Sequence, residues 1–314
     1  MEIEQELASV TPQGETLLTI GVFDGVHAGH RYLLKKLQQR AAERKLLSGV
    51  ITFNPHPQSV LHPHNQPPWL SNLEDRVRTL EELGINIVAV LTFTPKVAQL
   101  SAREFMSLLK KHLKMQGIMV GSDFALGRGG EGNIDLLRAL GHEMKFSVEA
   151  IRPYTINGEV VSSTLIRQAL AQGDMRRVQT LMGRYFYLRG KVITSDKRGR
   201  VLGFPTANLE IKPQQALPGN GVYATITQAT ITQVDGKRFP SATNIGTRPT
   251  FGEGEKTVET HLLQYRGDLY GKEIRVEFVE KLRDEQRFAS SEELKIQIEK
   301  DVRKVEALLA KDSK

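Results

Sequence analysis

The sequence predicts an α/β domain followed by a β-barrel domain. In the first half, apolar runs of strand length alternate with segments of helical spacing, which indicates βαβ units and a mostly parallel sheet. From Tyr185 onward, short β-rich runs are separated by Gly, Pro and Asn, a pattern that favours a compact antiparallel barrel. The 314 residues suit two domains of roughly 150 residues each. We place the two domains at residues 1–183 and 184–314.

The first half is expected to contain four strands separated by three helices. The strands are expected at residues 17–23, 48–53, 85–93 and 117–120, and the helices at residues 31–44, 76–83 and 102–115. The strand segments are apolar runs, and the helices place apolar residues three and four positions apart, as Leu33, Leu34 and Leu37 do. Because parallel sheets bind ligands beyond the carboxyl ends of their strands, the segments that follow these strands are candidate site segments.

The second half is expected to hold short strands at residues 187–194, 221–227, 258–263 and 273–278. One helix closes the chain, and Ser290 and Glu293 form the capping-box pattern that begins a helix. The apolar residues that follow at helical spacing form one face, which we expect to pack onto the barrel: Leu294, Ile298, Val302, Val305 and Leu309.

Composition limits the class of protein. Hydrophobic residues make up 39% and charged residues 25%, the balance of an ordinary globular protein. No apolar run approaches the roughly 18 residues of a membrane span, the N-terminus MEIEQEL is unlike a signal peptide, and cysteine is absent. These features favour a cytoplasmic protein without disulfides. The net charge of +7 is spread along the chain without a basic and aromatic stripe, which suits nucleotides at least as well as nucleic acid.

The segment GVFDGVHAGH, residues 21–30, carries the strongest functional pattern of the first half. The expected strand ends at Phe23, and Gly25 and Gly29 allow tight turns and close approach of a ligand to the backbone. His27 and His30 follow at the start of a helix, where free N–H groups and the helix dipole favour phosphate. Two imidazoles can donate hydrogen bonds there as charge develops on phosphoryl oxygens. The plain alternative is that the histidines cap the helix or lie on the surface.

Three further segments fit a nucleotide site, and each also has a plain structural alternative. Asn54 and His56 directly follow the second strand, where two prolines either fix the direction of His56 or form a rigid surface loop. The glycine-rich residues 121–133 can wrap a nucleotide, with Asp123 and Arg128 as polar contacts, although such loops are common. A third segment begins a helix and either caps it or binds phosphate: Ser162, Ser163, Thr164 and Arg167.

Together, GVFDGVHAGH, TFNPHP and VSSTLIRQAL resemble the HxGH nucleotidyltransferase superfamily, and specifically the adenylyltransferase module of bacterial bifunctional riboflavin kinase/FAD synthetases. The resemblance implies a Rossmann-like domain that transfers AMP from ATP to FMN and releases pyrophosphate. It implies that His27, His30 and Arg167 bind the triphosphate and stabilise its transition state. Other residues are implied to contact nucleotide or substrate: Gly21, Phe23, Asp24, Gly25, Asn54, His56, Asp123, Phe124, Arg128, Ser163 and Thr164.

The second half contains the segment LGFPTANL, residues 202–209, soon after an Arg-Gly-Arg sequence. Thr206 and Asn208 offer two neutral oxygens of the kind that suits Mg²⁺ shared with phosphates, and nearby glycines allow backbone to approach a phosphate. A plain polar turn is the alternative. Glu259 lies in an expected strand, VETHLL, and a carboxylate there can accept a proton from a substrate hydroxyl. Most glutamates, however, are simply solvated.

The segments GRYFYLRGKV, RGRVLGFPTANL, GVYATI, NIGTRPTFG, VETHLL and DLYGKEIRVEFVEKLRDEQRF occur in an order that resembles a bacterial riboflavin kinase across nearly all of residues 183–301. The resemblance implies a six-stranded antiparallel barrel with a C-terminal helix. It implies that Thr206 and Asn208 bind Mg²⁺–ATP and that Glu259 deprotonates the terminal ribityl hydroxyl. Further contacts are implied for Gly199, Arg200, Gly203, Pro205, Asn244 and Arg248.

The sequence therefore predicts a bifunctional enzyme that phosphorylates riboflavin to FMN and adenylylates FMN to FAD. Its expected ligands are riboflavin, FMN, FAD and ATP with Mg²⁺, and no nucleic acid or membrane. Neither glycine-rich segment has P-loop spacing. One alternative is a nucleotidyltransferase for another phosphate, joined to a regulatory flavin-binding barrel. Another is a basic module that binds RNA or DNA. The oligomeric state stays open.

Overall fold

The computed structural model describes residues 3–194, 203–229, 237–247 and 256–310. The chain divides into two compact units, Met1–Ser163 and Thr164–Lys314. Gly199, Arg200 and Arg248, three of the predicted contacts, lie outside the described residues. Among the helices that are described, none has the length and apolarity needed to cross a bilayer.

The first unit is built around a five-stranded parallel sheet in the order β3-β2-β1-β4-β5. Its strands are β1 (Thr16–Ile20), β2 (Leu47–Asn54), β3 (Ile87–Thr92), β4 (Met115–Gly121) and β5 (Ser147–Ile151). The chain runs outward from β1 to β3 and then crosses to β4 on the other side of β1. This reversal opens a crevice at the carboxyl ends of β1 and β4, where sheets of this kind bind ligands.

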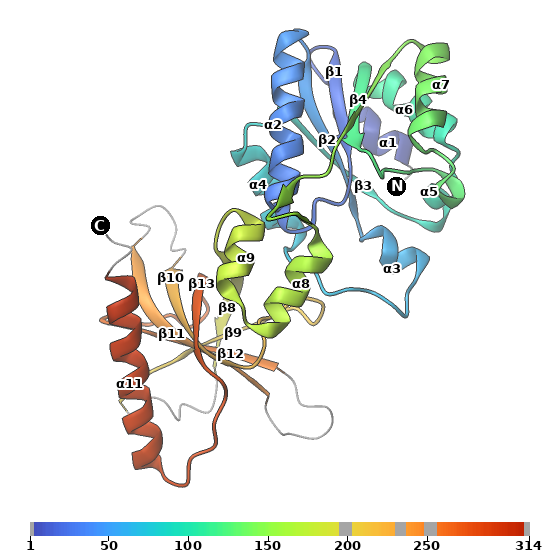
Figure 1. Cartoon of the computed structure of the whole chain (residues 1–314). Coiled ribbons are helices and arrows are strands. Elements are labelled where there is room, and N and C mark those ends of the chain that lie inside the picture. The colour runs from blue at the N-terminus through green and yellow to red at the C-terminus, as the bar shows by residue number, and fades with distance from the viewer. Residues whose placement is uncertain (1–2, 195–202, 230–236, 248–255, 311–314) are drawn as a thin grey trace. The chain divides into compact units, whose positions relative to one another are not determined.

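Helices cover both faces of this sheet (Figure 1). One face carries α2 (Ala28–Glu43) and α4 (Leu73–Glu82), and the other carries α1 (Ile3–Ala8), α6 (Ala102–Leu113) and α7 (Ile134–Met144). Leu17 of β1 packs beneath α2 and α4, whereas Leu18 packs beneath α1, α6 and α7. In β2, Val50 packs on the same side as Leu17, and Ile51 packs on the same side as Leu18. The sheet is therefore buried on both sides, which explains the continuous apolar runs.

Short elements complete the first unit: η1 (Asp24–Val26), α3 (Pro57–Leu61), α5 (Pro95–Ala98), η2 (Arg128–Gly130), and a hairpin of β6 (Thr155–Ile156) and β7 (Glu159–Val160). All four expected strands are present. The first one, however, ends at Ile20 and not at Phe23, because Phe23 has the left-handed backbone angles φ 55° and ψ 32°. Likewise α6 ends before Lys114, whose φ is 50°, so Met115 begins β4.

The second unit is a closed, six-stranded antiparallel barrel in the order β10-β11-β12-β9-β8-β13, as predicted. Its elements are α8 (Ser163–Gln172), α9 (Met175–Met182), β8 (Phe186–Ile193), β9 (Ala207–Leu209), β10 (Gly221–Ala229), β11 (Arg238–Thr247), β12 (Lys256–Leu262), β13 (Glu273–Arg283) and α11 (Ser291–Leu309). Two strands were not among those expected from the sequence: β9, which has only three residues, and β11, which is continuous although its sequence contains Pro240 and Gly246.

Part of the barrel interior is polar. Three neighbouring strands, β10 to β12, point hydroxyl groups inward, and these groups bond to one another and are fully buried: Thr225, Thr227, Ser241, Thr243 and Thr260. Each hydroxyl has a partner, so the network avoids the cost of an unsatisfied buried polar group.

Helix α11 lies along the outside of the barrel (Figure 1). Its apolar face packs on the barrel through Val305 and Leu309, as expected, and the Ser290 hydroxyl caps its first turn. Arg283, the last residue of β13, forms a buried ion pair with Asp301 of α11 at 2.9 Å. The side chain of Asp301 is 3% exposed and that of Arg283 is 14% exposed. This pair ties the helix to the end of the strand.

We predict that Asp301→Ala destabilises the barrel by roughly 3 kcal/mol, because it leaves the guanidinium of Arg283 buried without its counter-charge. Thermal and urea unfolding followed by circular dichroism would measure the loss. Arg176→Ala is the matched control, because it removes an ion pair of the same unit, to Glu280, that is exposed and worth at most about 1 kcal/mol. Equal losses in the two variants would contradict the prediction.

Candidate functional sites

The connection from β1 to α2 places two histidine rings face to face. The rings of His27 and His30 stack with their centroids 3.6 Å apart and an angle of 18° between their planes. Gly29 makes this stacking possible, because a Cβ atom there would lie 3.2 Å from the His27 ring and 3.3 Å from the carbonyl oxygen of Val161. Of the two residues between the histidines, the one that directly precedes His30 is therefore glycine for a steric reason.

The two histidines that follow strands both act as helix caps. His27 Nδ1 accepts a hydrogen bond from the backbone N–H of His30 at 3.3 Å, and His56 Nδ1 accepts one from Gln58 at 3.1 Å. The plain alternative of a capping role therefore holds for His27. It does not exclude a functional role, because a neutral ring that accepts at Nδ1 carries its proton on Nε2. Capping thus presets both rings as Nε2–H donors.

His30 is held in its neutral form. Burial lowers its pKa well below the ordinary value, and the nearby His27 and the cation of Arg76 lower the pKa further. Its Nδ1 atom is buried and makes no hydrogen bond to any described residue. Arg76, on the buried face of α4, donates to the carbonyl oxygen of Phe53 at 3.0 Å. The sequence analysis missed this arginine, which occupies a position where an amphipathic helix normally has an apolar residue.

Asp24 joins three segments of the first unit. Its carboxylate accepts hydrogen bonds from the backbone N–H groups of Leu70 and Ser71 at 3.0 and 3.1 Å, and Gly25 N–H donates to the Ser71 hydroxyl at 2.9 Å. The hydroxyl of Ser163 donates to the Asp24 carbonyl oxygen at 3.2 Å. The carboxylate that was predicted to contact nucleotide thus holds the turn to the 70–71 loop, and the backbone carbonyl of the same residue holds the turn to Ser163.

An apolar cavity of about 560 Å³ lies at the carboxyl ends of the strands. Gly21 and Phe124 line it, as part of the predicted set, but most of its wall was not predicted: Ile20, Val22, Phe53, Pro57, Leu61, His62, Phe93, Val97, Ala98, Leu100, Phe105 and residues 125–127, 129 and 130. The rings of Phe53 and Phe93 meet edge to face at 5.5 Å. These aromatic residues are far apart in sequence, so only the fold identifies them as one wall.

The glycine-rich loop after β4 folds back onto the start of α6. Arg128 N–H donates to the carbonyl of Leu100 at 2.8 Å, and the Glu131 carboxylate accepts from Ala102 N–H at 2.9 Å. Gly127 has φ 78° and leaves no room for a Cβ, which would lie 2.7 Å from Ala102 N. The loop is therefore a fixed part of the cavity wall. The side chains of Asp123 and Arg128 are not among those that line the cavity.

The remaining predicted residues of this set lie at the expected strand and helix ends. Asn54 is the last residue of β2, and Thr164 and Arg167 lie in the first and second turns of α8. Asn133, at the end of the glycine-rich segment, caps α7 by accepting from Leu136 N–H at 3.0 Å.

In the barrel, three predicted polar residues lie side by side on neighbouring strands. Glu259 of β12 pairs directly with Asn208 of β9 on one side and with Asn244 of β11 on the other. Directly paired residues project from the same face of a sheet. Val258 and Thr260 point into the barrel and are buried, so Glu259 and its two asparagine neighbours lie on the outer face. The register thus brings together residues that are up to 51 positions apart in sequence.

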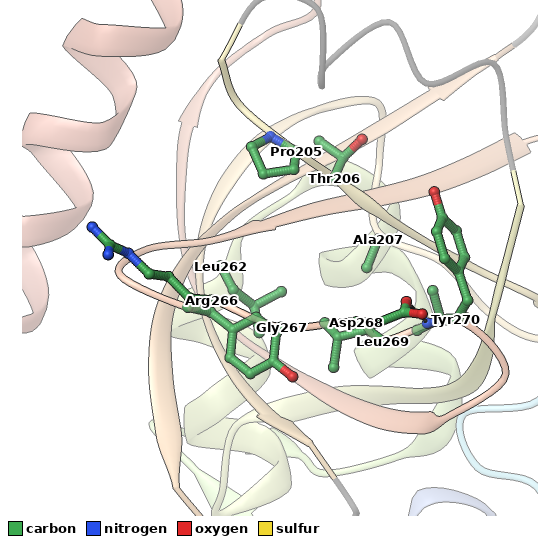
Figure 2. Close-up of a pocket in the computed structure, with 11 residues that line it drawn as sticks. Pro205, Thr206, Ala207, Leu262, Arg266, Gly267, Asp268, Leu269 and Tyr270 are labelled. Atoms are coloured by element: carbon green, nitrogen blue, oxygen red, sulfur yellow. Dashed lines mark hydrogen bonds between the residues drawn. The ribbon is translucent and has the colours of Figure 1, made fainter.

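A second cavity in the barrel unit has a volume of about 590 Å³ and is lined by the residues that directly precede Asn208, although not by the three residues of the row themselves. Pro205, Thr206 and Ala207 line one side, and the loop between β12 and β13 lies across from them (Figure 2). That loop contributes residues that were not singled out from the sequence: Tyr265, Arg266, Gly267, Asp268, Leu269 and Tyr270. Some of these residues could have been found from the sequence, because the DLYG part of the riboflavin kinase resemblance falls in this loop. Gly203 precedes the segment and is exposed.

His261 is a further residue that the sequence analysis missed. It lies two positions after Glu259 and therefore on the same outer face of β12. Its Nδ1 donates to the carbonyl oxygen of Pro205 at 2.8 Å, and its ring meets Phe204 edge to face. His261 therefore fastens the Pro-Thr-Ala-Asn segment to the strand that carries Glu259.

A parallel-sheet unit with paired histidines at its first helix start, together with a barrel that carries a Thr, Asn and Glu set, indicates a transferase that acts on nucleotides. Comparison with known families agrees with this class. The FAD synthetase family model matches residues 10–165, and the riboflavin kinase family model matches residues 182–309.

Relatives cover almost the whole chain. The chain is 40% identical over 294 residues to the bifunctional riboflavin kinase/FMN adenylyltransferase of Escherichia coli K12, and the aligned region covers 93% of this chain and 92% of the relative. It is 34% identical over 295 residues to the enzyme of the same name from Bacillus subtilis, and that aligned region covers 92% of this chain and 91% of the relative. The chain belongs to the bifunctional riboflavin kinase/FMN adenylyltransferase family. A crystal structure described as a macrolide-efflux protein from Streptococcus pneumoniae has the same fold, with a TM-score of 0.86, 26% identity and 96% of each chain covered.

We predict that the first unit loses stability as the pH falls below about 6.5, the ordinary pKa of histidine. In the folded protein the pKa of His30 is lower than in the unfolded chain, so acid protonates the unfolded chain first and favours it, by up to about 1.4 kcal/mol per pH unit. Urea unfolding followed by the fluorescence of Trp69, the single tryptophan, would measure this. His30→Gln should flatten the pH dependence, whereas the exposed control His142→Gln should not. Parallel pH dependences in His30→Gln and the unmodified protein would refute it.

We also predict that His261→Ala loosens the Pro-Thr-Ala-Asn segment. Removal of one hydrogen bond worth about 1 kcal/mol should raise amide hydrogen exchange there roughly fivefold. His261→Gln should restore protection, because its amide group can donate to Pro205. Exchange measured by mass spectrometry on peptides that contain residues 204–209 tests this, and unchanged exchange in His261→Ala would show that the bond is not needed.

Proposed function

We propose that this chain phosphorylates riboflavin to FMN in the barrel and transfers AMP from ATP to FMN in the parallel-sheet unit, releasing pyrophosphate. The observation that carries the proposal is that both family models match in order within one chain, each over the unit that holds the corresponding residues. The product of the first reaction is the substrate of the second. Riboflavin, FMN, FAD and ATP are then the ligands of the two cavities.

In the kinase reaction, we assign Glu259 as the general base. Its carboxylate takes the proton of the terminal ribityl hydroxyl, the hydroxyl oxygen forms a bond to the γ-phosphorus of ATP, and ADP leaves. Phosphoryl transfer depends mainly on positioning and on neutralising charge. The cavity lined by Thr206 and the β12–β13 loop is suitably placed for the adenosine part of ATP, because Thr206 and Ala207 directly precede Asn208, the neighbour of Glu259.

Thr206 and Asn208 fit a Mg²⁺ ion that arrives with ATP. Their hydroxyl and amide oxygens are hard neutral ligands, and Asn208 is directly paired with Glu259. Magnesium keeps few protein ligands when phosphates supply the rest. When bound, the ion would offset negative charge on the phosphates.

In the adenylyl transfer, a phosphate oxygen of FMN attacks the α-phosphorus of ATP and pyrophosphate leaves. We assign His27 and His56 as Nε2–H donors to the phosphates, and His30 as a neutral partner that orients His27. Arg167, on α8, supplies a permanent positive charge for the triphosphate. The apolar cavity with Phe53, Phe93 and Phe124 is suited to the flavin ring, because it is aromatic and of appropriate size.

We further propose that the functional domains are 1–183 and 184–314. The family models end at residue 165 and begin at residue 182, and α9 ends at Met182, before Gly183 with φ 69°. By contacts alone α8 and α9 group with the barrel. A cytoplasmic location follows from the need for ATP.

The two activities should be separable by substitution. Glu259→Gln should reduce FMN formation from riboflavin by at least 10²-fold, because the base is lost, yet leave FAD formation from added FMN intact. His27→Ala combined with His30→Ala should have the opposite effect. Chromatography of flavins after incubation with ATP and Mg²⁺ measures both reactions. A folded single-site variant that lost both activities would contradict two independent sites.

A further inference from the structure

Part of the wall of the apolar cavity is a short loop that leaves the sheet at the end of β3. Phe93 follows β3 directly, and Val97 and Ala98 of α5 line the same cavity. The hydroxyl of Thr94 caps α5 by accepting from Val97 N–H at 3.2 Å. Phe93 N–H donates to the carbonyl oxygen of Asn54 at 3.2 Å, and Thr92, the last residue of β3, directly precedes Phe93. A shift of Thr92 would therefore change how the Phe93 ring and α5 lie against the cavity.

A single carboxylate of the N-terminal helix α1 forms hydrogen bonds to the start of this loop. Glu6 accepts two hydrogen bonds from Thr92, one from its backbone N–H at 2.8 Å and one from its hydroxyl at 2.5 Å. The two residues are 86 positions apart in sequence. Bonds to a carboxylate are stronger than bonds between neutral groups. A pair of them to both donors of one residue fixes its orientation as well as its position.

Helix α1 is itself firmly attached to the unit. Leu7 is fully buried in the core beneath α6, and Glu4 pairs with Lys111 of α6 at 2.6 Å and with His112 at 3.2 Å. Glu4 also borders a pocket that Thr94, Lys96 and Val97 line, but its carboxylate bonds to α6, whereas the Glu6 carboxylate bonds to Thr92. Leu7 and Glu4 thus attach helix α1 to the unit, whereas Glu6 connects it to Thr92, next to the cavity wall.

We propose that Glu6 is a positioning residue for the flavin in the adenylyl-transfer site, an inference that rests on the proposed function of the apolar cavity. Glu6 does not line the cavity, so it acts through Thr92 on Phe93 and α5. Loss of its carboxylate would let the β3–α5 wall shift away from a flat aromatic ligand. FMN binding would weaken, whereas the phosphates and the groups that act on them would be unaffected.

The test compares Glu6→Ala, Glu6→Gln and Glu4→Ala in the full chain. Glu6→Ala should raise the KM for FMN, and the Kd for FMN measured by quenching of flavin fluorescence, roughly five- to tenfold, with kcat nearly unchanged. Glu6→Gln should restore most of the affinity, because its amide can accept from Thr92 N–H and donate to the Thr92 hydroxyl. Glu4→Ala is the matched control, since it removes a carboxylate of the same helix that bonds to Lys111 and His112 of α6 and not to Thr92.

Two results would overturn the proposal. One is a KM for FMN in Glu6→Ala within twofold of that of the unmodified protein. The other is an equal rise in Glu4→Ala, which would indicate a general loosening of α1. Riboflavin phosphorylation in the barrel serves as an internal control in every sample and should not change. Failure of the unmodified protein to convert FMN to FAD would instead contradict the proposed function, so the two failures can be told apart.

A double-mutant cycle gives an independent check. Thr92→Val removes the hydroxyl donor, and if Glu6 acts through Thr92, the effects of Glu6→Ala and Thr92→Val on the Kd for FMN must be less than additive. Additive effects would show that Glu6 influences the cavity by another route, and the proposal would fail.

Discussion

The geometry of the first site depends on the buried carboxylate of Asp24. The carboxylate accepts hydrogen bonds from two backbone N–H groups of a loop 46 and 47 residues away. The backbone carbonyl oxygen of Asp24 accepts a third hydrogen bond, from the hydroxyl of Ser163. A carboxylate is costly to bury without such donors. Three hydrogen bonds to Asp24 therefore hold the turn that contains His27. In this turn Phe23 and Val26 have positive φ angles, which an isolated peptide would avoid.

The barrel site depends instead on strand register. Glu259 faces outward only because β12 pairs with β9 and β11 in one particular alignment. A shift of one residue would turn Glu259 into the barrel and expose Thr260. The inward hydroxyls of Thr260, Thr243 and Thr225 bond to one another, so such a shift would break that network as well. The buried polar core thus helps to keep Glu259, Asn208 and Asn244 aligned on the outer face.

These two constraints explain what the sequence could and could not predict. Continuous apolar runs predicted the buried strands, whereas β5 was missed because all five of its residues are only half-buried. Motifs that follow strands were placed at one sheet edge correctly, since parallel strands end there together. Arg76, Phe93 and Glu6 could not be predicted, because each matters through a partner at least 23 residues distant. His261 could have been predicted from the sequence, because the alternation of side chains along a strand places it on the same face as Glu259.

The two sites meet the charge of a triphosphate in different ways. In the first unit the one acidic side chain in the histidine turn, Asp24, is buried and bonded to backbone N–H groups, so its charge is directed away from the proposed phosphate donor His27. In the barrel, the proposed base Glu259 would have to lie close to the phosphates in order to accept a proton, and like charges there repel. A site that needs a carboxylate base therefore also needs a cation, which is the physical reason for hard oxygen ligands such as Asn208 directly beside it.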